Sequence, residues 1–151
     1  MSQPTTVHEI TVKYDPPKRA KNYQIIKSSK DAYACAVQFF PENIIQLQEH
    51  FAVLYLNRAN KVIGGYKISI GGITSTVVDI RLILSVALKT LATGLILVHN
   101  HPSGNLKPSK SDEEITIRVK EAAKLMDIQV LDHIILVSGG EYYSFADEGL
   151  V

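Results

Sequence analysis

Two histidines separated by a single residue follow a continuous apolar run in this 151-residue chain. This position makes them the side chains best placed to do chemistry. That run is Leu95 to Val98; His99 comes directly after it and His101 two residues later. Asp112 lies thirteen residues after His99, in the first turn of a predicted helix. Two imidazole nitrogens and one carboxylate oxygen suit tetrahedral zinc and leave a fourth position for water. Because zinc lowers the pKa of such a water from about 16 to about 7, the pattern predicts a hydrolytic metal centre.

The same segment also has ordinary structural interpretations. Ser109 to Asp112 has the pattern of an N-terminal helix cap, with Ser109 as the capping residue. Histidines in a loop are often only polar surface, and Pro102, Gly104 and Pro108 can simply shape the loop. A helix cap and a metal site can coexist on these residues, so their joint occurrence favours the metal site.

Alternating helices and strands must position these side chains. Periodicity predicts helices over about 29–40, 79–92 and 110–126, and strands over 8–14, 51–56, 61–64, 66–70, 95–98, 128–137 and 142–145. Gly94 is expected to end the second helix. Because helices and strands interleave along the whole length, we expect one structural unit with a layered α/β fold. Within it, residues 1–48 form an N-terminal extension of a strand plus a helix, packed on a core of residues 49–151.

The composition narrows the class of protein. Hydrophobic residues make up 46% of the chain and charged residues 21%, which is typical of a globular domain. Sixteen basic and fifteen acidic residues leave a net charge of +1, which argues against direct nucleic-acid or membrane-surface binding. The single cysteine, Cys35, excludes a disulfide framework and a cysteine-rich zinc site, and its helical spacing predicts a buried side chain. The N-terminus has no secretory pattern, so we expect a cytoplasmic protein.

The spacing of the histidine segment resembles the metal-binding signature of the JAMM (JAB/MPN) metalloprotease family, His-x-His-Pro, six residues, Ser, two residues, Asp. The five matching positions are His99, His101, Pro102, Ser109 and Asp112. Three segments resemble the bacterial RadC branch of that family: 99–104, 131–135 and 143–146. The resemblance covers residues 49 to 151. It implies a JAB/MPN-type layered domain, with a mixed β-sheet flanked by helices and an architecture like that of cytidine deaminases.

The resemblance implies a role for each matching polar residue. His99, His101 and Asp112 become ligands of Zn²⁺, and Ser109 donates its hydroxyl to the oxyanion that forms when a carbonyl is attacked. The family also needs an upstream glutamate, at the start of a strand, as the general base. Glu49 fits best because the strand predicted over 51–56 follows it, and Glu42 is the alternative.

The expected function is a zinc-dependent metallopeptidase or isopeptidase that acts on a protein or peptide. The alternative is a non-catalytic JAMM-like binding module, linked to DNA repair or replication as the RadC name suggests. The residues before Glu49 do not resemble the helix-hairpin-helix region of longer RadC proteins, which weakens any inference of DNA binding. The sequence does not indicate the oligomeric state.

Other classes of metalloenzyme fit less well. HNH nucleases scatter their three residues through a ββα-metal unit, whereas the letters are adjacent here. A zinc deaminase needs His-x-Glu and a later Pro-Cys-x-x-Cys, but residue 101 is histidine and Cys35 lies far upstream. His133, in a predicted buried strand, is interpreted as a core histidine, with support of a ligand histidine as the alternative.

Overall fold

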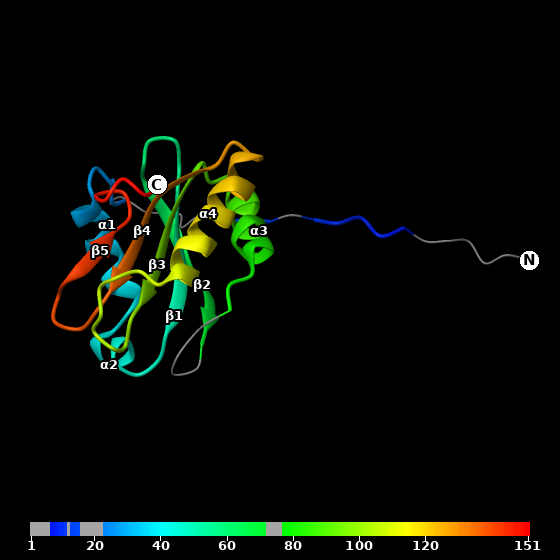
Figure 1. The fold of residues 1–151 in the computed structure, drawn as a ribbon. Coiled ribbons are helices and arrows are strands. Elements are labelled where there is room, and N and C mark those ends of the chain that lie inside the picture. Colours follow the sequence, from blue (N-terminus) through cyan, green and yellow to red (C-terminus); the bar gives the residue numbers. More distant parts are fainter. Residues whose placement is uncertain (1–6, 12, 16–22, 72–76) are drawn as a thin grey trace, which may run out of the picture.

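A five-stranded mixed sheet forms the centre of the computed structural model, which describes residues 7–11, 13–15, 23–71 and 77–151 (Figure 1). The elements in chain order are α1 (Ser29–Ala36), the 3₁₀-helix η1 (Val37–Phe39), α2 (Glu42–Ile45), β1 (His50–Leu56), β2 (Val62–Ile70), α3 (Ile80–Thr90), β3 (Gly94–Asn100), α4 (Lys110–Lys124), β4 (Gln129–Leu136) and β5 (Tyr142–Ser144). The strand order is β2-β1-β3-β4-β5. This is the layered α/β fold that the sequence predicts.

Two central strands, β1 and β3, are buried along their whole length. β1 pairs antiparallel with both β2 and β3, whereas β3 and β4 are parallel and α4 connects them. One face of the sheet packs its apolar side chains against α1 and α2, and the other face packs against α3 and α4 (Figure 1). Cys35 is buried in the first of these two layers, as the sequence predicts.

The strand pairing brings the start of β1 to the carboxyl end of β3. Phe51 pairs with His99, so Glu49, which immediately precedes β1, lies beside the segment that follows β3. The first turn of α4 also lies at this end of the sheet, because the loop after β3 leads directly into it (Figure 1). The strand register therefore brings together three separate stretches of sequence: the residues before β1, the loop after β3 and the first turn of α4.

The strand predicted over residues 8–14 is wrong for the residues described there. Residues 7–11 and 13–15 form no strand, and they run away from the sheet as the blue trace in Figure 1. Val7 and Ile10 are 88% and 87% exposed. A period-two pattern forms a stable strand only when a neighbouring strand supplies hydrogen bonds, and no described strand pairs with this segment.

The predicted end of the second helix is also wrong. α3 begins at Ile80, one residue after the predicted start, with Asp79 as its capping residue. It ends at Thr90, and the residue that follows, Leu91, adopts the left-handed conformation with φ 56°. Gly94 is instead the first residue of β3. The amide of Leu91 donates to the carbonyl groups of Ala87 and Leu88, so the helix closes three residues earlier than the glycine suggests.

No helix within the described ranges is both long and apolar enough to cross a membrane.

Candidate metal centre

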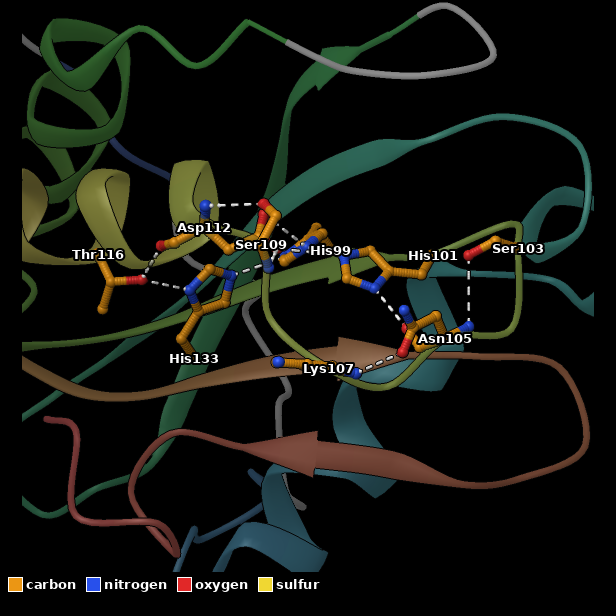
Figure 2. A network of polar contacts seen from close by, with 9 residues as sticks. All are labelled: His99, His101, Ser103, Asn105, Lys107, Ser109, Asp112, Thr116 and His133. Carbon is orange, nitrogen blue, oxygen red and sulfur yellow. Dashed lines mark hydrogen bonds and ion pairs between the residues drawn. The ribbon is translucent and has the colours of Figure 1, made fainter.

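Three side chains predicted as metal ligands converge at the carboxyl end of β3 (Figure 2). The Nε2 atoms of His99 and His101 are 2.9 Å apart. His99 Nε2 is 3.1 Å from Asp112 Oδ1, and His101 Nε2 is 3.3 Å from Asp112 Oδ2. The edge of a tetrahedron around a zinc ion with bonds of 2.0–2.1 Å measures about 3.3 Å. The donor set and its spacing therefore fit an ion of this size.

His99 is held rigidly at the end of a buried strand. Its side chain is 1% exposed, and its ring stacks on that of Phe51 with the ring centroids 6.0 Å apart. His101 lies in the following loop, where its Nδ1 is 2.6 Å from the Asn105 carbonyl oxygen. Burial lowers the pKa of His101, but the contacts with Asp112 and this carbonyl outweigh it and raise the pKa overall. Packing thus orients the His99 ring, the Asn105 carbonyl orients the His101 ring, and each ring directs its Nε2 at Asp112.

Asp112 belongs to a helix cap and to the ligand cluster at the same time. The Ser109 amide donates to Asp112 Oδ2 at 2.6 Å, and the Asp112 amide donates to Ser109 Oγ at 3.1 Å, which completes a capping box at the start of α4. Burial raises the pKa of Asp112, but the nearby rings of His101 and His99 and the hydrogen bond from the Ser109 amide hold it well below its usual range. The carboxylate is therefore ionised and available to a cation.

His133 supports His99 from inside the protein. Its ring is fully buried, and its Nε2 is 2.7 Å from His99 Nδ1. On its other side, His133 Nδ1 is 2.6 Å from the hydroxyl of Thr116, which also donates to the Asp112 carbonyl at 2.6 Å. Burial holds the pKa of His133 well below its usual range, so the ring is neutral. Sequence reasoning missed Thr116, whose only signal is its place one helical turn after Asp112.

Asn100, between the two histidines that are predicted as ligands, is a second residue that sequence reasoning missed. Its side chain is completely buried and crosses from β3 to the segment that precedes β1. Asn100 Oδ1 accepts from the His50 amide at 2.7 Å. Its Nδ2 donates to the carbonyl oxygens of Ile45 and Gln48 at 2.9 Å and 2.8 Å. Because Gln48 and His50 flank Glu49, Asn100 ties the backbone around that glutamate to the ligand-bearing strand.

A cleft of about 710 Å³ opens over the cluster. Glu49, His101, Ser109 and Asp112 all line it. Burial raises the pKa of Glu49, and the two histidines lower it by less. Glu42 lies outside this lining; its carboxylate accepts instead from the Ser138 hydroxyl and, at 3.3 Å, from the Gly139 amide. Of the two glutamates considered, the structure places only Glu49 beside the cluster.

Comparison with known proteins agrees with this geometry. The family model described as RadC-like JAB domain matches residues 26–150. The chain is 47% identical over 125 residues to a UPF0758 protein from Flavobacterium johnsoniae, covering 83% of this chain and 53% of the relative. It is 40% identical over 136 residues to one from Porphyromonas gingivalis (90% and 59%), and 46% identical over 101 residues to one from Streptococcus gordonii (67% and 44%).

The chain thus spans roughly half the length of these relatives, whose name states no activity. The family model covers most of the chain, including Glu49 and the three residues that could hold a metal ion, His99, His101 and Asp112. The resemblance seen in the sequence is therefore confirmed, and the chain belongs to the RadC-like JAB domain family.

Proposed function

We propose that this domain is a zinc-dependent hydrolase that cleaves an amide bond in a protein or peptide, either a peptide or an isopeptide bond. The observation that carries the proposal is the convergence of two imidazole nitrogens and an ionised carboxylate, within 3.3 Å of one another, in a cleft that Glu49 also lines. Three protein ligands and an open side are typical of catalytic rather than structural zinc sites.

His99, His101 and Asp112 would hold the ion. Zinc in this position would supply Lewis acidity, lowering the pKa of water to about 7 and polarising the carbonyl oxygen of an amide.

The proposed location of this hydrolase is the cytoplasm. The only cysteine of the chain, Cys35, is buried and free, and a protein without an internal disulfide suits the reducing conditions there.

Glu49 is the proposed general base. It accepts a proton from the water that attacks the carbonyl carbon, and it returns this proton to the nitrogen of the leaving amine. A group that must gain and lose a proton in one cycle works best with a pKa close to the working pH. The raised pKa of Glu49, which burial causes, supports this role.

Ser109 is the proposed oxyanion donor. In the capping box Ser109 Oγ accepts from the Asp112 amide, and this bond uses the oxygen but not the hydroxyl proton. The proton remains available to a negatively charged oxygen in the cleft. Loss of one such donor lowers kcat by about 10² to 10³ in hydrolases. We expect a similar loss in Ser109→Ala, with zinc retained.

The test combines metal analysis with a panel of peptides and isopeptides. The parent chain should bind close to one zinc ion, and His99→Ala and Asp112→Ala should lose it. Glu49→Gln should keep zinc and abolish cleavage. Glu42→Gln is the matched control, because this glutamate lies outside the cleft, and it should keep both zinc and activity.

Two outcomes would contradict the proposal. Equal zinc content in the parent, His99→Ala and Asp112→Ala would refute the ligand set. Stoichiometric zinc with no cleavage across the panel would favour a non-catalytic binding module of the same family instead.

A further inference from the structure

A continuous chain of polar contacts runs from the backbone of α4 to the metal-facing edge of His99 (Figure 2). It passes from the Asp112 carbonyl to the Thr116 hydroxyl, then through the ring of His133 to His99 Nδ1. Its three contacts measure 2.6, 2.6 and 2.7 Å, all within hydrogen-bond distance. All four residues are buried.

The Asp112 carbonyl, in the first turn of α4, determines which group donates and which accepts in each of these hydrogen bonds. A carbonyl oxygen can only accept, so Thr116 gives its hydroxyl proton to Asp112 and its oxygen must accept from His133 Nδ1–H. A neutral imidazole carries one proton, so His133 Nε2 is an acceptor and takes the Nδ1–H of His99. The proton of a neutral His99 ring is thus held on Nδ1, and Nε2, which lies 3.1 Å from Asp112 Oδ1, is the nitrogen left to bind an ion.

The aromatic neighbours of His133 keep its ring in the orientation that this chain needs. The ring stacks on Phe145 with the centroids 4.7 Å apart, and it meets the edge of Phe51 at 5.7 Å. Both rings belong to the buried core. Rotation of His133 would therefore require these packed rings to move.

We propose that His133 and Thr116 are positioning residues that set the tautomer of His99, so that its Nε2 lone pair faces the metal centre. This inference rests on the proposed metal site. His101 reaches the same state by a separate route, because its Nδ1 faces the Asn105 carbonyl, which can only accept. Removal of the Thr116 hydroxyl should reverse the direction of these hydrogen bonds. His133 then donates from Nε2 to His99 Nδ1, and His99 presents its Nε2–H to the site.

The test uses three single substitutions. Thr116→Val keeps the shape of the side chain and removes its hydroxyl, whereas Thr116→Ser keeps the hydroxyl. Thr90→Val is the matched control, because Thr90 likewise donates its hydroxyl to a carbonyl one turn earlier, Val86 at 2.8 Å, but in α3. Nitrogen-15 NMR of the imidazole rings in the zinc-free chain, recorded over a pH series, distinguishes the two neutral tautomers from each other and from the doubly protonated ring.

We expect His99 and His133 to be protonated on Nδ1 in the parent, Thr116→Ser and Thr90→Val, and to shift toward Nε2–H in Thr116→Val. Zinc affinity, measured by competition with a chelating dye, should fall about 10- to 100-fold in Thr116→Val alone, as for other residues that orient ligand histidines. An unchanged tautomer in Thr116→Val, or equal losses of affinity in the Val and Ser variants, would overturn the inference.

The metal site and the tautomer of His99 are tested separately by these measurements. A parent chain that binds no zinc refutes the proposed function, whereas the tautomers in the zinc-free chain still decide the role of His133 and Thr116.

Discussion

Removal of the Asn100 side chain is the most direct test of how the strand that carries the ligands holds the segment around Glu49. Asn100→Ala abolishes two buried hydrogen bonds, of 2.7 and 2.9 Å, and a partly buried one of 2.8 Å. At a net contribution of about 1 kcal/mol for each bond, the free energy of unfolding should fall by about 3 kcal/mol. The amide and two carbonyl groups left without partners can only increase this loss. For a chain of this length, about 3 kcal/mol corresponds to a decrease in Tm of about 6 to 12 °C.

The assay is urea unfolding of the parent and the variant, followed by metal analysis of the folded proteins. Asn105→Ala is the matched control: its side chain is exposed and accepts from the Lys107 amide at 3.0 Å, so we expect a loss below about 1 kcal/mol. Because Asn100→Ala leaves all three ligands in place, zinc content should stay near that of the parent while cleavage falls. A loss of stability no larger than that of the control would show that the Asn100 side chain does not hold this segment in place.

Two further predictions concern stability. Gly65→Ala should destabilise the fold by about 1 to 3 kcal/mol, because the new methyl group would overlap the ring of Phe39, whereas Gly64→Ala meets only open space and should be neutral or stabilising; equal urea midpoints would contradict this. Burial raises the pKa of Asp132, so the folded state binds its proton more tightly than the unfolded state. Stability should therefore fall as the pH rises from about 4 through the raised pKa, and Asp132→Asn should flatten this part of a pH series of unfolding free energies; an unchanged slope would show that another group causes it.

The ligand cluster could be predicted from the sequence because its geometry is mostly local. His99, His101 and Asp112 lie within fourteen consecutive residues, and the end of a buried strand and the start of a capped helix determine where each one points. The interleaved pattern of helices and strands likewise predicts the layered fold, since each element buries a recognisable apolar face.

The supporting contacts could not be fixed from the sequence, because they depend on how distant strands pair. For His133 the sequence offers support of a ligand histidine only as the alternative to a core histidine, and the structure shows a fully buried ring that contacts His99. His133 follows His99 by 34 residues and meets it only because β4 lies parallel beside β3. Asn100 reaches across to the chain before β1, some 50 residues earlier. Spacing along the sequence carries no record of such register. The absence of a strand at the described N-terminal residues has a similar reason, since alternation does not reveal whether a partner strand exists.

Asp112 belongs both to the capping box of α4 and to the cluster with His99 and His101, so the backbone of the first turn of α4 should report whether the metal site is occupied. Helix ends open locally at far lower free energy than the whole fold, and opening of this first turn would carry the carboxylate away from both histidines. An ion bound by all three side chains adds its binding free energy to the closed turn. The Glu113 amide, which closes the turn on the Ser109 carbonyl at 3.1 Å, should then exchange its hydrogen with solvent more slowly as the site fills. Occupancy can thus be read from one peptide group, without knowledge of any substrate.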